Sequence, residues 1–159
     1  MRKQKVYLET TLFNHYFDDD RGLAHTSTVA LFKEIAAGKY AAFTSDYVVN
    51  ELEDAPIEKR GKMIGLIEEY DITVIALDAE AEQLAEVYVE QGVIPLKYRT
   101  DGIHIAVAAV NDLDMIISLN FQHIVKRKTK IASMSINTLN GYRTVEIISP
   151  MEVFENEND

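Results

Sequence analysis

The sequence predicts an α/β fold, in which a mostly parallel sheet of about five strands is covered by helices on both faces. Two observations lead to this prediction. Short apolar runs alternate along the chain with longer stretches of helical periodicity, which is the pattern of strand–helix–strand units. Hydrophobic residues make up 47% of the 159 residues, enough for the core of one domain. We expect that domain at 1–154, followed by an acidic, disordered tail at 155–159.

The strands are predicted from short runs that are rich in apolar and β-branched residues. Turn residues or cap residues flank each run on both sides. In chain order we expect them at 5–8, 41–44, 72–75, 115–118 and 145–148. Pro150 ends the last of them, because proline cannot donate a ladder hydrogen bond.

The helices are predicted from apolar residues at helical spacing and from residues that start or stop a helix. In chain order we expect them at about 10–17, 25–37, 48–52, 56–70, 78–91, 101–110 and 129–139, with a short helical turn at 121–125. Gly38 suits the end of the second helix, and either Ser45 or Asp46 can cap the third. Pro56 opens the fourth and Asp78 caps the fifth. The sixth is the most apolar, so we expect it in the centre of the core.

The composition disfavours several classes of protein. Cysteine is absent, which excludes a disulfide framework and a thiolate zinc site. No apolar stretch is long enough to span a bilayer and no signal-peptide core follows the basic start, so a cytoplasmic protein without a membrane partner is expected. The formal net charge of −10 argues against a general nucleic-acid coating protein, because phosphate repels a negative surface.

Three acids and one asparagine follow strands or open helices in the predicted order. Glu9 directly follows the first strand, and Glu51 lies about one helical turn past the second. Asp101 opens the buried helix, and Asn120 follows the fourth strand by two residues. Ligands of parallel sheets bind beyond the carboxyl ends of the strands, so these side chains are candidates for one site. Their oxygens suit Mg²⁺ or Mn²⁺, which can generate a hydroxide nucleophile at a phosphate; the set points to a metal-dependent nuclease.

Four segments together resemble the PIN-domain family, of the VapC-like toxin ribonuclease type, in the family's order and spacing. These segments are Val6–Thr11, Ser45–Leu52, Asp101–Ala106 and Ile116–Asn120. The resemblance implies a Rossmann-like three-layer α/β/α sandwich, an acidic centre that binds Mg²⁺ or Mn²⁺, and ribonuclease activity. It also implies an antitoxin protein as a partner, and a homodimer.

The sequence departs from the family pattern at two positions. The first acid is usually Asp but is Glu9 here, which is one methylene longer. The last acid is usually Asp but is Asn120 here, whose amide oxygen brings no negative charge. Both changes are expected to weaken the binding of a divalent metal relative to an all-acid site.

Two classes of function follow from these residues. The first is a metal-dependent endoribonuclease that hydrolyses RNA phosphodiesters, as the toxin of a toxin–antitoxin pair. The second is a catalytically weak or inactive PIN-like module that binds RNA or a protein partner. A small phosphohydrolase or receiver-like domain ranks last, because the acid and lysine arrangement of a receiver is missing.

Each candidate residue has an expected role. The catalytic set is Glu9, Glu51, Asp101 and Asn120, with Glu9, Asp101 and Asn120 as metal ligands. Substrate contacts are expected from Thr10, Lys126, Arg127 and Lys128, with His104 and His123 as accessory residues.

Several of these residues also have an ordinary structural alternative. Asp101 is then a helix N-cap, Thr10 and Thr11 cap the first helix, Glu51 is an exposed acid, Asn120 ends a strand, and His104 is a packed core histidine. The basic residues at 126–130 and at 2–5 form either solvated faces or a rim that guides RNA.

Overall fold

The computed structural model describes residues 2–155 and contains a five-stranded parallel sheet with the order β3-β2-β1-β4-β5. The strands are β1 (Gln4–Leu8), β2 (Tyr40–Ser45), β3 (Thr73–Ile75), β4 (Met115–Ile117) and β5 (Glu146–Ile148). The strands expected from the sequence are therefore confirmed, with ends that differ by one residue at most.

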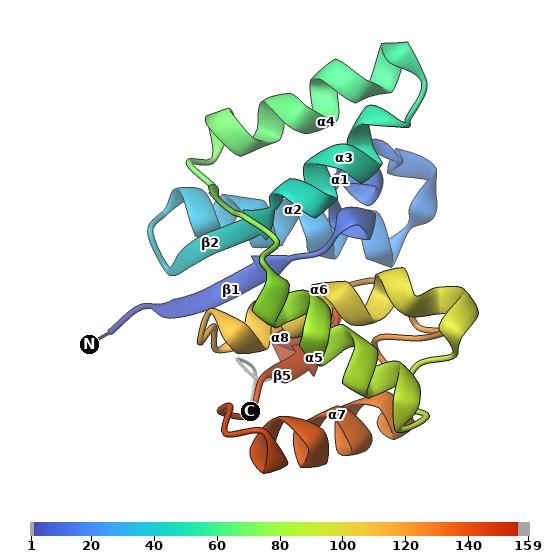
Figure 1. The fold of residues 1–159 in the computed structure, drawn as a ribbon. Coiled ribbons are helices and arrows are strands. Elements are labelled where there is room, and N and C mark those ends of the chain that lie inside the picture. Colours follow the sequence, from blue (N-terminus) through green and yellow to red (C-terminus); the bar gives the residue numbers. More distant parts are fainter. Residues whose placement is uncertain (1, 156–159) are drawn as a thin grey trace.

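Helices cover both faces of the sheet. They are α1 (Thr10–Phe17), α2 (Leu23–Ala36), α3 (Asp46–Glu53), α4 (Ile57–Glu69), α5 (Ala79–Glu90), α6 (Arg99–Val110), α7 (Arg127–Leu139) and α8 (Pro150–Glu155), with the 3₁₀ turns η1 (Asp19–Arg21) and η2 (Leu96–Tyr98). Figure 1 shows α1 to α4 gathered on one side of β1 and α5 to α7 on the other, while α8 contacts α2. The predicted three-layer α/β/α sandwich is confirmed.

The last helix, α8, was not expected from the sequence. Ser149 Oγ accepts a hydrogen bond from the backbone N–H of Glu152, and Glu152 Oε2 accepts one from the N–H of Ser149, both at 3.3 Å. This reciprocal pair is a capping box, and Pro150 is suited to the first helical position. The Ser-x-x-Glu spacing was thus the available signal. Apart from Glu155, the expected disordered tail at 155–159 lies outside the described residues.

Local capping fixes how the chain enters and leaves the helices near the site. Ser45 caps α3 by accepting a hydrogen bond from the N–H of Val48, whereas Asp46 accepts one from Leu77 and holds the chain after β3. Asp78 caps α5 as predicted. Gly38 follows α2 with φ +85°, a conformation that glycine adopts without strain, and thereby ends the helix where the sequence predicts.

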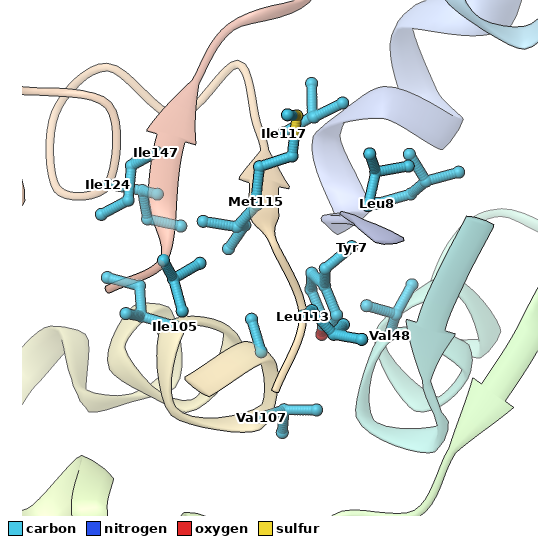
Figure 2. Close-up of a cluster of buried hydrophobic side chains, with 14 of the residues drawn as sticks. Tyr7, Leu8, Val48, Ile105, Val107, Leu113, Met115, Ile117, Ile124 and Ile147 are labelled. Carbon is cyan, nitrogen blue, oxygen red and sulfur yellow. The ribbon is translucent and has the colours of Figure 1, made fainter. Parts of the chain in front are cut away.

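The core lies between the sheet and its two helical layers. Residues 102–109 of α6 are all buried, as expected for the most apolar helix. Figure 2 shows Ile105 and Val107 of this helix in one cluster with side chains from β1, β4 and β5. Within residues 2–155, no helix is long and apolar enough to cross a bilayer.

The strand order creates one point where the winding of the sheet reverses. From β1 the chain proceeds to β2 and β3 on one side, and later returns to add β4 and β5 on the other. The crevice outside the carboxyl ends of β1 and β4 is therefore the topological switch point at which open α/β sheets bind ligands. Leu8 and Ile117 are paired at this end, so the residues that follow them are neighbours.

Candidate functional site

Glu9 lies at the switch point and is buried, with 4% of its surface exposed. Its Oε1 atom accepts hydrogen bonds of 2.6 Å from the hydroxyls of Thr11 and Ser118, the latter placed by the end of β4. A buried carboxylate is costly unless it is hydrogen-bonded, and these two hydroxyls reduce that cost. Ser118 was not among the residues predicted for the site, although its place directly after an apolar strand was a usable signal.

Glu51 reaches the same region from α3. Its Oε1 atom lies 2.6 Å from Thr10 Oγ1, the donor, and 2.8 Å from His104 Nε2. Burial by itself raises the pKa of Glu51, but the hydrogen bond and charge of His104 and the Thr10 hydroxyl outweigh burial, so the pKa lies below its usual range. Glu51 is therefore bonded within the site rather than an ordinary exposed acid.

The expected capping role of Thr10 and Thr11 is wrong. Glu9 occupies the N-cap position of α1, with no side-chain cap bond. Thr10 donates instead to Glu51, and Thr11 donates to Glu9 and accepts a hydrogen bond from the N–H of Leu119. Both threonines hold carboxylates, and Thr11 also holds the chain after β4, because the first turn of α1 faces the switch point.

A buried series of hydrogen bonds connects Glu51 through His104 to the interior of the protein. His104 Nδ1 lies 2.7 Å from the Tyr7 hydroxyl, which lies 2.8 Å from Ser45 Oγ. Burial lowers the pKa of His104, but the Glu51 hydrogen bond and the negative charges of Glu9, Glu51 and Asp101 raise it above its usual value. His104 is thus a packed, hydrogen-bonded histidine that also fixes a site carboxylate.

Asp101 pairs with the second accessory histidine. It lies in the first turn of α6, which begins at Arg99, so the alternative that Asp101 is the N-cap is wrong. Its Oδ2 atom lies 3.1 Å from His123 Nδ1. Burial raises the pKa of Asp101 above its usual value, against the opposing effects of His123, His104 and a hydrogen bond with Asn120.

Asn120 links Asp101 to the turn after β4. Its Oδ1 atom accepts a hydrogen bond of 3.1 Å from the N–H of His123, and its backbone carbonyl accepts from Ile124 and Val125. These bonds form the helical turn expected at 121–125. Asn120 therefore caps the turn, as the ordinary alternative states, but it does not end the strand, because β4 ends at Ile117; its amide also contacts a site acid.

The donor set does not fit a divalent cation as it is arranged. Among the described residues 2–155, no group of three His, Asp or Glu side chains could hold a metal ion. The carboxylates of Glu51 and Asp101 pair with histidines, and that of Glu9 accepts from hydroxyls. Mg²⁺ and Mn²⁺ favour an open set of oxygen ligands and bound waters, which these pairings do not provide. The metal-ligand roles of Glu9, Asp101 and Asn120 stay a prediction.

The two basic clusters lie at different ends of the sheet. Arg2 is bonded to Asp114 at 2.6 Å, and this cluster lies at the amino end of β1, whereas Glu9 lies at the carboxyl end. The hypothesis that residues 2–5 form a rim that guides RNA to the acids is therefore wrong. The exposed residues Lys126, Arg127 and Lys128 directly follow the turn that carries His123. Their expected contact with substrate stays a prediction.

Comparison with known proteins shows the same architecture. No protein-family model and no curated protein matches this sequence. VapC20 of Mycobacterium tuberculosis, a toxin that cleaves the sarcin-ricin loop, has a TM-score of 0.54 and 12% identity, over 89% of this chain and 98% of that chain. VapBC2 from Rickettsia felis, bound to a DNA fragment from its promoter, has a TM-score of 0.56 and 10% identity, over 92% and 98%. This chain has a VapC-like PIN-domain fold.

The PIN-domain resemblance seen in four short segments is thereby confirmed as a likeness of fold. The PIN fold explains why those segments meet, since each lies at or beside the carboxyl end of a parallel strand or opens the helix packed against it. At 10% and 12% identity, the two solved structures establish the fold alone.

Proposed function

We propose that this protein is a PIN-type endoribonuclease that hydrolyses RNA phosphodiesters at the switch point. The observation that supports this most directly is that Glu9, Glu51 and Asp101, far apart in the sequence, share one connected hydrogen-bonded and electrostatic centre. The similarity of the fold to that of VapC20, a toxin that cleaves the sarcin-ricin loop, favours RNA as the substrate.

The chain's own residues supply the acceptors that phosphodiester hydrolysis requires. A water oxygen forms a bond to phosphorus while the bond to the leaving oxygen breaks, and the water proton must pass to a base. The carboxylates of Glu51 and Asp101 are the candidate acceptors, oriented by His104 and His123 respectively. The expected dependence on Mg²⁺ or Mn²⁺ is part of the test.

The test is cleavage of end-labelled RNA by the purified protein in Mn²⁺, in Mg²⁺ and in chelator. Glu51→Gln keeps the shape of the side chain but removes its charge, and we expect cleavage to fall by about 100-fold or more. Glu53→Gln, on the exposed surface of the same helix, is the matched control and should cleave as the wild type does. Undiminished cleavage by Glu51→Gln would overturn the proposal.

The same proposal includes a protein partner. VapBC2 is a complex that binds promoter DNA, and we propose that this protein is likewise the toxin of a pair, neutralised by an antitoxin, and a homodimer. Expression of the chain alone should arrest growth, and co-expression of an adjacent open reading frame should restore it. Light scattering should give twice the chain mass of 18.0 kDa. A monomer, or growth arrest that no adjacent frame relieves, would contradict these parts.

A second function is favoured by the histidine pairings of the carboxylates. Glu51 and Asp101 already have histidine partners, and the raised pKa of His104 favours its charged form, so part of the charge of Glu51 is compensated without a cation. In that case the protein is a PIN-like module that binds RNA without cleaving it. RNA binding that persists in chelator, with no cleavage in Mn²⁺ or Mg²⁺, would select this function.

A further inference from the structure

A pocket of about 470 Å³ opens directly beside the acidic centre. Three rings line it, those of Tyr98, Phe121 and His123, together with the polar side chains of Asp101 and Asn120. Asp101 and Asn120 belong to the centre described above, so a molecule in this pocket would lie against the site carboxylates. The pocket is therefore placed to hold part of the substrate rather than an unrelated ligand.

Two of the three rings that line this pocket are exposed, whereas His123 is partly buried. Phe121 is 49% exposed and Tyr98 is 37% exposed, although a single exposed apolar residue would need no explanation. Here both flank the same cavity at the carboxyl edge of the sheet. Exposed rings beside polar side chains are an arrangement on which proteins stack the bases of single strands.

Two of the three rings, those of Tyr98 and His123, are held in place before any ligand binds. The rings of Tyr98 and His123 stack with centroids 3.9 Å apart and an interplanar angle of 25°. His123 is fixed in turn by Asp101 Oδ2 and, through its backbone N–H, by Asn120 Oδ1. A preorganised platform loses little conformational freedom on binding, which favours affinity.

The charges around the pocket indicate a base rather than a phosphate as the occupant. Asp101 lines the pocket, and the whole chain has a formal net charge of −10, so a bare phosphate would be repelled. The side-chain amides of Asn120 and Gln122 can donate and accept, as the edge of a nucleobase does. Lys97, which does not line the pocket, places its Nζ over the ring of Tyr98, 5.6 Å from the centroid.

We propose that Tyr98, Phe121 and His123 form a nucleobase-binding subsite, which takes one unstacked base of single-stranded RNA next to the phosphodiester that reacts. This rests on the proposed function and adds to it the side chains that would hold a base beside the reacting phosphodiester. A base within a duplex cannot enter the pocket unless it first leaves the stack.

The experiment measures binding of a fluorescein-labelled single-stranded RNA octamer, and of the same octamer in a duplex, in chelator. The integrity of the RNA is checked after each titration. The variants are Phe121→Ala, Phe121→Tyr, which keeps a ring, and Phe17→Ala, an exposed aromatic on α1 outside the pocket. Circular dichroism and thermal melting confirm that each variant is folded.

We expect the wild type to bind the single strand more tightly than the duplex, and Phe121→Ala to weaken single-strand binding by about tenfold. Phe121→Tyr, which keeps the ring, should retain more single-strand binding than Phe121→Ala, and Phe17→Ala should bind as the wild type does. Equal binding by the wild type and Phe121→Ala, or no single-strand binding by the wild type, would overturn the subsite.

The outcomes separate the subsite from the proposed function. If Glu51→Gln and the wild type both fail to cleave RNA while Phe121→Ala loses binding, the nuclease function fails and the subsite stands. If cleavage depends on Glu51 while Phe121→Ala binds and cleaves as the wild type does, the nuclease function stands and the subsite fails.

Discussion

His104 Nε2 lies 2.8 Å from Glu51 Oε1, in the interior beneath the acidic centre. The imidazole is 1% exposed, and its other nitrogen lies 2.7 Å from the hydroxyl of Tyr7. One side chain of α6 thereby ties a carboxylate of α3 to the central strand β1. The position of Glu51 depends on this histidine, and so does part of the stability of the fold.

Replacement of His104 by alanine should lower the free energy of unfolding by about 3 kcal/mol, because it removes one partner of a largely buried pair and leaves Tyr7 with one bond fewer. Urea denaturation at neutral pH measures the change. His25→Ala is the control, since His25 is only partly buried and bonds a single backbone carbonyl. An equal loss of unfolding free energy in both variants would show that the pairing of His104 with Glu51 adds nothing to the stability of the fold.

The stabilisation by His104 should depend on pH. The folded protein holds the pKa of His104 above its usual value of about 6.5, so the contribution is fully present below that value and is lost as the pH rises through the folded pKa. The difference in unfolding free energy between the wild type and His104→Gln should therefore narrow as the pH rises above about 6.5 and through the folded pKa. The pKa of Glu51 is lowered, so its contribution is lost only at acid pH. A difference that widens would contradict the pairing.

Replacement of Asp101 by asparagine should stabilise the fold at neutral pH. Because burial raises the pKa of Asp101, its ionised form destabilises the folded state above that pKa, and this penalty disappears as the pH falls through it. We expect Tm to rise by about 2 °C at pH 7, with no gain near pH 3. Asp54→Asn, at an exposed position, should leave Tm unchanged. A lower Tm for Asp101→Asn would mean that the bond to His123 outweighs burial.

Loss of the capping box should destabilise α8. Ser149→Ala removes the oxygen that accepts from the N–H of Glu152, and the expected cost is about 1 kcal/mol in the free energy of unfolding. Ser135→Ala, whose hydroxyl bonds a carbonyl of its own exposed helix, is the matched control and should have a smaller effect. Identical unfolding curves for the wild type and Ser149→Ala would show that the cap does not support this helix.

The sequence by itself determined the succession of strands and helices, since apolar periodicity and caps are local signals. It also indicated that Glu9 and Asn120 would lie near each other, because residues that follow parallel strands share one edge of the sheet. Asp101 opens the helix that precedes β4, so its position depends on that helix. The helix α8 was missed although Ser149 and Glu152 have the spacing of a capping box.

Only the tertiary structure decided which groups bond to the acids. Ser118 donates to Glu9 across 109 residues of sequence, and Thr10 donates to Glu51 across 41. The pairing of Glu51 and Asp101 with histidines, in place of a cluster that could hold a metal within residues 2–155, was likewise not readable from spacing. A hydrogen bond requires a separation of about 3 Å between two particular atoms, and for residues this far apart only the packing of α3, α6 and the turn after β4 sets that separation.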